Sequence, residues 1–243
     1  MAKTYVIGDI HGALKALEQL IAKIDLQRDD RLIFLGDYVD GWSQSSEVIA
    51  FLMDLDQQQD CLFIKGNHDA WCEQWIDGAD PDPTWLAHGG LATIASYKPL
   101  TKKQKQAHLA FLNRMRYFHI DYENRLFIHA GFSAMRGPAQ EHFASTCYWD
   151  RTLWETALGL DDRIDPDSLY YPKRLLLFHE IYIGHTPTVN YGITEPMNAY
   201  NIWNVDTGAA FDGRLSAMDI DTKKFWQSDI VQELYPGEKG RNK

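Results

Sequence analysis

The sequence Gly36-Asp37-Tyr38-Val39-Asp40 follows an apolar run at residues 32–35, and the interpretation of the whole chain starts from it. The run is entered through polar residues and left through a glycine, which is typical of a buried strand that ends in a loop. Asp37 and Asp40 therefore lie at the carboxyl end of that strand, where open α/β sheets place their ligands. The same pattern of an apolar run followed by a glycine occurs at residues 6–12 and 63–69. We predict that three strand ends deliver Asp, His and Asn side chains to one place.

Strands and helices alternate in the first part of the chain. Apolar runs at residues 5–7, 32–35 and 61–64 predict strands, and helical spacing of apolar residues predicts a helix between each pair. Each strand–helix–strand segment matches a βαβ unit of roughly 30 residues. Residues from about 68 to 116 then predict a helical insertion that covers one side of the sheet.

In the second half of the chain the apolar residues no longer follow helical spacing, and the pattern predicts strands. Residues 117–121 and 126–129 flank a polar turn, as the strands of a β-hairpin do, and residues 181–185 predict a buried strand that ends in Gly-His. Further strands are predicted at residues 199–205, 215–220 and 224–228. The polar residues 237–243 are expected to fray. No Ser/Gly-rich or Pro-rich linker divides the chain, so residues 1–243 predict one domain.

Composition narrows the class of protein. The 243 residues are 45% hydrophobic and 24% charged, which suits a chain with a real core, and no apolar stretch approaches a membrane span. The formal net charge of −10 should repel nucleic acid. The first residues run straight into a strand without a leader pattern, so we expect a cytoplasmic protein. Cys61, Cys72 and Cys147 lack paired short spacing, so neither a disulfide framework nor a zinc knuckle is indicated.

Six side chains that follow apolar runs supply carboxylate, imidazole and amide oxygen donors. They are Asp9, His11, Asp37, Asn67, His129 and His185. Taken singly, an Asp or Asn after a strand is most often a turn or helix cap. Together this mixture of donors suits Mn²⁺, Fe²⁺ or Zn²⁺. Six donors exceed one tetrahedral site, so we predict two metals about 3.5–4 Å apart that share a carboxylate, a site that fits hydrolysis of a phosphate ester.

Five short motifs around these side chains follow one another along the chain. They are Gly8-Asp9-Ile10-His11-Gly12, Gly36-Asp37-Tyr38-Val39-Asp40, Gly66-Asn67-His68-Asp69, His129-Ala130-Gly131 and Gly184-His185-Thr186. In this order they resemble the motifs of the calcineurin-like metallophosphoesterases, and the chain is most similar to the phosphoprotein phosphatase branch of that family. This branch includes bacterial serine/threonine phosphatases and symmetrical diadenosine tetraphosphatases. The resemblance implies a four-layer α/β metallophosphoesterase fold, with a central β-sandwich of mixed sheets flanked by helices.

The resemblance also implies a role for each motif residue. The first metal would be held by Asp9, His11 and Asp37, and the second by Asp37, Asn67, His129 and His185. Mn²⁺ is the expected ion, with Fe and Zn also compatible. His68 resembles the general acid that protonates the leaving alkoxide, and Asp40 resembles the carboxylate that orients it. Hydroxide bridging the two metals would attack phosphorus directly, without a phosphoenzyme.

The chain departs from the family pattern after Asp40. Where the family continues Val-Asp-Arg-Gly, this chain has Val39-Asp40-Gly41-Trp42, so a phosphate-binding arginine is missing and its replacement is left open. Arg151 resembles the second phosphate arginine of the bacterial relatives. We place Trp42 hypothetically at the pocket mouth or against an aromatic leaving group. Asp69 is expected to cap a helix. For His88 we weigh a pocket-lining role against a structural one and favour the structural role.

These observations predict a metal-dependent phosphomonoesterase that acts on phosphorylated serine or threonine of proteins, or on a small phosphoester. A diadenosine tetraphosphate or nucleotide hydrolase is an alternative, although the acidic chain offers few extra cations for a polyphosphate. A degenerate phosphatase that binds phosphoproteins without turnover is a second alternative, kept open by the missing arginine. Neither nucleic acid nor a membrane is expected as a partner. The substrate, the native metal and the oligomeric state do not follow from the sequence.

Overall fold

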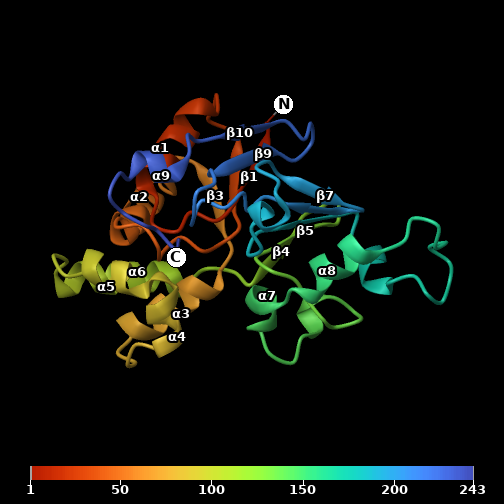
Figure 1. Cartoon of the computed structure of the whole chain (residues 1–243), viewed down its shortest axis with the longest axis horizontal. Helices are drawn as coiled ribbons and strands as arrows, with labels where there is room; N and C mark the ends of the chain where they lie inside the picture. The colour runs from red at the N-terminus through yellow and green to blue at the C-terminus, as the bar shows by residue number, and fades with distance from the viewer. Residues whose placement is uncertain (1, 243) are drawn as a thin grey trace.

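The computed structural model describes residues 2–242, and these form two five-stranded mixed sheets (Figure 1). The first sheet has the strand order β10-β9-β1-β2-β3. Its strands are β1 (Thr4–Ile7), β2 (Arg31–Phe34), β3 (Asp60–Phe63), β9 (Ser216–Asp219) and β10 (Phe225–Gln227). Strands β1, β2 and β3 are parallel, and β9 pairs antiparallel with β1. The register pairs Ile7 with Phe34 and Phe34 with Phe63, so the three parallel strands end level with one another.

The second sheet has the order β4-β5-β6-β8-β7 and a parallel centre of β5, β6 and β8. Its strands are β4 (Phe118–Ile120), β5 (Arg125–Ile128), β6 (Glu180–Ile183), β7 (Met197–Ala199) and β8 (Ile202–Asn204). The antiparallel pair β4–β5 is the hairpin that the sequence predicts. The strand predicted at residues 199–205 is confirmed as β8, but its start is wrong, because the chain turns at Tyr200, whose φ is 54°, and Ala199 belongs to β7, which pairs antiparallel with β8.

Helices surround the two sheets. In chain order they are α1 (Leu14–Lys23), α2 (Ser45–Leu55), α3 (Asn67–Ile76), α4 (Pro83–Trp85), α5 (Leu91–Ser96), α6 (Lys102–Asn113), α7 (Thr146–Trp149), α8 (Thr152–Gly159) and α9 (Val231–Leu234). A π-helical turn, η1 (Leu86–Gly90), joins α4 to α5, and single 3₁₀ turns lie at η2 (Pro138–Gln140), η3 (Lys173–Leu176) and η4 (Thr188–Tyr191). None of the helices within residues 2–242 has the length and apolar character needed to cross a bilayer.

Three buried clusters define the layers. One lies between the sheets and takes Val6 and Ile33 from the first and Phe127 and Tyr182 from the second. Another packs the outer face of the first sheet against α1 and α2, and a third packs the second sheet against α8. Figure 1 shows α1, α2 and α9 on the side of the first sheet, and α7 and α8 beside the second. The arrangement of helix, sheet, sheet and helix confirms the predicted fold.

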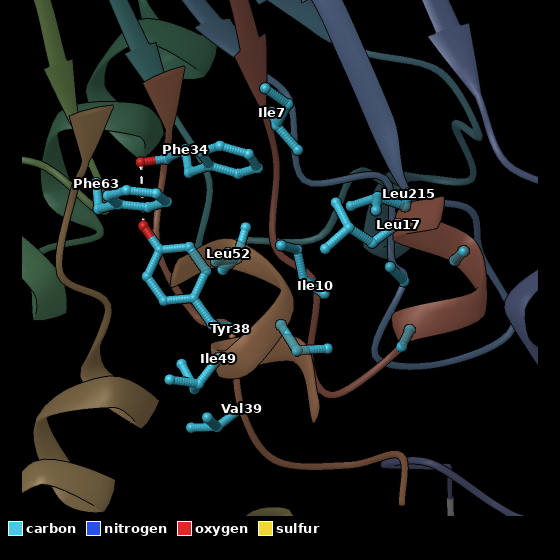
Figure 2. Close-up of a cluster of buried hydrophobic side chains, with 14 of the residues drawn as sticks. Ile7, Ile10, Leu17, Phe34, Tyr38, Val39, Ile49, Leu52, Phe63 and Leu215 are labelled. Carbon is cyan, nitrogen blue, oxygen red and sulfur yellow. Dashed lines mark hydrogen bonds between the residues drawn. The ribbon is translucent and has the colours of Figure 1, made fainter. Parts of the chain in front are cut away.

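The loop after β2 is built into the core as well as into the site. Tyr38 is fully buried, and its hydroxyl donates to the carbonyl oxygens of Ile64 at 2.7 Å and Phe34 at 3.3 Å, the latter drawn in Figure 2. The rings of Phe34 and Phe63 stack beside it at 5.2 Å between centroids. This anchoring fixes the chain on both sides of Asp37, because Tyr38 follows it directly and Phe34 lies three residues before it.

The expected fraying of residues 237–243 is wrong for residues 237–242, and Lys243 lies outside the described residues. Trp42 is fully buried, stacks on Tyr235 at 5.2 Å and donates from Nε1 to the carbonyl oxygen of Ala209 at 2.7 Å. The backbone N–H of Arg241 donates to the carbonyl oxygen of Ala210 at 2.9 Å. The hypothesis that Trp42 lines the pocket mouth is therefore wrong as well, since this side chain belongs to the core under the C-terminal segment.

Candidate metal centre

The carboxyl ends of five parallel strands converge on one buried cluster. Asp9, Asp37 and Asn67 follow β1, β2 and β3, while His129 and His185 follow β5 and β6. Asp9, His11, Asp37, Asn67, His129 and His185 are each at most 7% exposed. The two sheets pack face to face, and the parallel strands lie at the centre of each. Donors up to 176 residues apart in the sequence therefore become neighbours. The structure thus brings together all six side chains that the sequence singled out.

Asp37 lies at the centre of the cluster. Its Oδ2 atom is 3.6 Å from Nε2 of His11 and 3.4 Å from Nε2 of His129. Two ligands of one metal, each bound at about 2.1 Å, lie roughly 3 to 3.5 Å apart, so these separations suit shared coordination better than a direct hydrogen bond. Asp37 also belongs to two groups of three buried donors that lie within 4.8 Å of one another, one with His11 and His68 and the other with His129 and His185.

The backbone fixes the ring orientation of two of these histidines. Nδ1 of His129 lies 2.8 Å from the carbonyl oxygen of Leu35, and Nδ1 of His11 lies 3.2 Å from that of Val39. A carbonyl can only accept, so each Nδ1 carries a proton and each Nε2 faces the cluster. His129 Nε2 also lies 3.3 Å from Oδ1 of Asn67. Although burial lowers the pKa of His129, its contacts with the Asp37 carboxylate outweigh burial and raise it, so a divalent ion would displace a proton from this Nε2.

Two buried atoms in the cluster lack any hydrogen-bond partner in the described structure, Oδ1 of Asp9 and Nε2 of His185. Buried polar atoms without partners are costly, and both of these are good ligand atoms. Gly184 approaches Asp9 so closely that a Cβ there would lie 2.0 Å from the same Oδ1. The donor set and its unsatisfied atoms therefore fit two divalent metal ions.

The backbone at the cluster is strained where the side chains must turn inward. His11, Asp37, Asp40 and His185 all have positive φ, at 54°, 53°, 76° and 68°. Residues with a Cβ rarely adopt this left-handed region, and such conformations concentrate at functional sites. Asp69 supports the strained turn, because its carboxylate accepts the backbone N–H groups of Asp37 at 2.8 Å, Tyr38 at 2.9 Å and Gly66 at 2.8 Å. It therefore ties the β2 loop to the start of α3 as well as capping that helix.

His68 and Asp40 form a buried pair at the edge of the cluster. Nδ1 of His68 lies 2.5 Å from Oδ2 of Asp40. Asp40 also accepts from Nε1 of Trp85 at 2.6 Å and from Oγ1 of Thr93 at 2.5 Å. Three donors thus fix the carboxylate, and the carboxylate fixes the imidazole. The sequence missed Trp85 and Thr93, because nothing in the local pattern of the helical segment shows that it folds back onto Asp40.

The buried carboxylates of the cluster have pKa values shifted in opposite directions. Burial disfavours ionisation of Asp37, but the imidazoles of His129, His68 and His11 outweigh it and hold its pKa well below the ordinary value. Burial, with the charges of Asp206 and Asp37, raises the pKa of Asp9 well above its ordinary value. Burial raises the pKa of Asp206 to about 6. A cluster of this kind gains stability when cations bind, because they offset the repulsion between its carboxylates.

The other titratable ligands are shifted as well. Burial lowers the pKa of His185 well below its ordinary value, and the charges of His129 and Arg151 act in the same direction. Burial and the guanidinium of Arg241 likewise lower the pKa of His11. Both imidazoles are therefore neutral at pH 7, which is the form that binds a metal.

A cavity of about 290 Å³ opens above the cluster. Its floor includes His11, Asp37, Asn67, His68 and His185, and its walls include Trp71, Thr84, His88, Trp149, Arg151, Asp206, Phe211 and Arg241. Arg151, which the resemblance suggested as a phosphate contact, lines this cavity, and its role there stays a prediction. His88, expected to be structural, is exposed at the wall, and its Nδ1 lies 2.7 Å from the carbonyl oxygen of Thr84.

Two further residues of the cavity were missed from the sequence. Asp206 follows β8 by two residues and lies near Asp9, and the Asp-Thr-Gly sequence that begins at it is the signal that could have pointed to it. Arg241 comes from the last residues of the chain. Its Nη1 atom lies 3.4 Å from Nε2 of His11, a contact across 230 positions that no local pattern indicates.

The fold and the cluster together are those of a two-metal phosphoesterase, and the comparisons with known proteins agree. The sequence profile of the calcineurin-like phosphoesterases matches residues 2–208. The chain belongs to the calcineurin-like phosphoesterase family. Members of this family typically bind two divalent metals, and the two groups of donors that share Asp37 fit that number.

Several curated relatives share most of their length with this chain. A bis(5'-nucleosyl)-tetraphosphatase PrpE [asymmetrical] of Oceanobacillus iheyensis is 27% identical over 239 residues, covering 92% of this chain and 90% of the relative. A protein of the same name from Bacillus thuringiensis is 29% identical over 230 residues, covering 88% of each chain.

Solved structures share the fold at lower identity. A candidate diadenosine tetraphosphatase superposes with a TM-score of 0.64 at 18% identity, covering 93% of this chain and 92% of the other. The cold-active protein-tyrosine phosphatase of a Shewanella species superposes with a TM-score of 0.57 at 14% identity, covering 94% of this chain and 81% of the other.

Proposed function

We propose that the protein is a two-metal hydrolase of nucleoside polyphosphates, with dinucleoside tetraphosphates as the leading substrate class. The observation that carries the proposal is the position of two guanidinium groups, those of Arg151 and Arg241, over the donors that share Asp37. Neither arginine takes part in any ion pair within residues 2–242. Guanidinium groups that face a cavity without carboxylate partners suit a substrate that carries several negative charges.

We assign one metal to Asp9, His11 and Asp37 and the other to Asp37, Asn67, His129 and His185. Mn²⁺ is the proposed ion, because the donors are oxygen and imidazole nitrogen without a thiolate, with Fe²⁺ and Zn²⁺ as compatible substitutes. When bound, the metals supply the Lewis acidity that lowers the pKa of water and offsets phosphate charge.

His68 is the proposed proton donor. Its Nδ1 is engaged by Asp40, so only Nε2 remains to deliver a proton to a leaving oxygen in the cavity. Trp85 and Thr93 keep the Asp40 carboxylate in place and thereby keep the ring aimed. Positioning of this kind is effective because a fixed ring holds its Nε2 atom in one place relative to the leaving oxygen.

Aromatic side chains at the cavity wall suit a nucleoside. Trp71 and Trp149 lie edge to face with 5.0 Å between ring centroids, and Trp149 is 41% exposed. Phe211 forms part of the same wall. Bases stack on such aromatic surfaces with little dependence on which base is present. The small number of basic side chains in the protein does not argue against a polyphosphate substrate, because Arg151 and Arg241 both line this cavity. The names carried by the Oceanobacillus and Bacillus relatives support the same class.

Hydrolysis of phosphorylated serine or threonine in proteins is the second candidate function. The buried pair of His68 and Asp40 favours it, because an alkoxide is a poor leaving group without a proton donor, whereas a nucleotide leaving group needs one less. The same pair and the complete donor set argue against a binding protein without turnover.

A substrate comparison tests the proposal. The Mn²⁺-loaded protein is assayed with diadenosine tetraphosphate, ATP, p-nitrophenyl phosphate and a phosphoserine peptide, and kcat/KM is compared among them. We expect diadenosine tetraphosphate to exceed the phosphopeptide by at least about 10-fold, a difference near 1.4 kcal/mol in transition-state stabilisation. The reverse order would establish the monoesterase, and no turnover of any substrate would leave only the binding function.

A further inference from the structure

The position of Gly41 is closely covered by a residue from the far end of the chain. Gly41 follows Asp40 directly, and its φ is 98°. A Cβ atom built on Gly41 would lie 3.2 Å from Cγ and 3.6 Å from Cδ of Arg241. The aliphatic stem of Arg241 therefore runs across the space that a side chain at position 41 would enter. A side chain at position 41 and the side chain of Arg241 would occupy the same space, and in this protein Arg241 fills it.

The guanidinium of Arg241 extends from that stem into the cavity. Nη1 lies 3.4 Å from Nε2 of His11, and the guanidinium carbon lies 5.4 Å from the centroid of the Phe211 ring. Arg151 lines the same cavity. Arg241 forms no ion pair within residues 2–242, and its Nη1 contacts His11, so the guanidinium retains further N–H donors for an anion.

The segment that carries Arg241 is anchored on both sides of position 41. The ring of Trp42 supports it, and a Cβ on Gly240 would lie 2.6 Å from that ring. Ser43 donates from its backbone N–H and from its hydroxyl to the Glu238 carboxylate, at 3.0 Å and 2.8 Å. Gly41 thus leaves space for the C-terminal segment, Trp42 packs against it, and Ser43 binds it through hydrogen bonds.

We propose that Arg241 is a phosphate-positioning residue, delivered from the C-terminus to the place that Gly41 leaves open. It would act together with Arg151 and hold a terminal or bridging phosphate of the substrate over the donor cluster. This inference rests on the proposed function, because it assumes that a phosphate occupies the cavity. A planar guanidinium pairs with phosphate through two parallel N–H bonds, which an ammonium cannot reproduce.

The test compares Arg241→Gln, Arg241→Lys and Arg241→Ala with the wild type, all loaded with Mn²⁺. Lys239→Ala is the matched control, because it removes the same charge from the same segment, and Lys239 lies outside the cavity at the cluster. Binding of inorganic phosphate is measured by calorimetry, bound manganese by mass spectrometry and kcat/KM with p-nitrophenyl phosphate.

We expect phosphate affinity to fall roughly 10- to 100-fold in Arg241→Gln, as for loss of a charge-assisted pair, with the manganese content unchanged. Arg241→Lys should recover only part of the affinity. Added methylguanidinium should restore part of the activity of Arg241→Ala, which a merely structural role would not allow. Lys239→Ala should match the wild type.

Phosphate affinity in Arg241→Gln within about twofold of the wild type would overturn the inference, as would absence of phosphate binding to the manganese-loaded wild type. An equal loss in Lys239→Ala would also overturn it, because the effect would then be one of general charge. If the wild type binds phosphate through Arg241 but hydrolyses none of the four substrates, the proposed function fails while this inference stands.

Discussion

Nδ1 of His68 lies 2.5 Å from Oδ2 of Asp40, and both side chains are almost completely buried. The pair stands beside the donor cluster and shares no atom with the contacts of Asp37 to His11 and His129. Two carboxylates of one short segment thus have different neighbours, and the roles that we propose for them differ accordingly: Asp37 as a metal ligand and Asp40 as the residue that orients the proton donor.

Asp40→Asn should lower kcat by about 100-fold for alkyl phosphates, because the imidazole loses the carboxylate that orients it for proton transfer. The loss should be smaller for p-nitrophenyl phosphate, whose leaving group needs no proton. Steady-state kinetics across leaving groups of different pKa check this, with Trp85→Phe as a milder variant that removes one bond to Asp40. An equal loss for all leaving groups would argue that Asp40 has no part in proton transfer.

Trp42→Ala should destabilise the protein by about 3–5 kcal/mol, because it empties a fully buried site under the C-terminal segment. Trp42→Phe retains an aromatic ring that can stack on Tyr235, but it loses the bond to Ala209 and part of the packing under Gly240, so it should cost less than Trp42→Ala. Urea unfolding followed by fluorescence measures both values. Unchanged stability together with an altered substrate preference would instead return Trp42 to the pocket.

Protonation of His108 should contribute to acid sensitivity. Its side chain is 5% exposed, and burial lowers its pKa, partly opposed by the charge of Glu47. The unfolded chain, with an ordinary pKa near 6.5, then binds more protons, so the free energy of unfolding should fall as the pH drops below about 6.5. His108→Gln should flatten this dependence between pH 5 and about 7 in urea titrations. The same slope in the variant and the wild type would exclude His108 as a contributor.

The sequence predicted the parts of the site that lie next to strands. Asp9, Asp37 and His185 follow apolar runs, and parallel strands in register must bring such residues to one edge. The hairpin β4–β5 was equally visible, because its polar turn separates two apolar segments. These features depend on local pattern and on the geometry of parallel sheets, and both can be read without coordinates.

The parts that were missed depend on contacts between distant segments. Trp85 and Thr93 reach Asp40 only because α4, η1 and α5 fold back over the β2 loop, and Arg241 reaches His11 across 230 positions. Trp42 was misplaced because a tryptophan beside a site residue suits a pocket wall and a buried platform equally well. The C-terminal segment was expected to fray because its composition is polar, whereas its backbone bonds and its packing on Trp42 hold it in place.

We propose that Asp37 is shared by two metal ions, and every other role assigned to the site depends on this. The most direct test is the metal content and activity of Asp37→Asn beside the wild type, both purified in Mn²⁺ and measured by mass spectrometry and phosphoester hydrolysis. We predict close to two ions per wild-type chain, at most one in the variant, and a fall in activity of at least about 1000-fold, since an amide cannot bridge as a carboxylate does. Two retained ions with near-normal hydrolysis in Asp37→Asn would contradict the account.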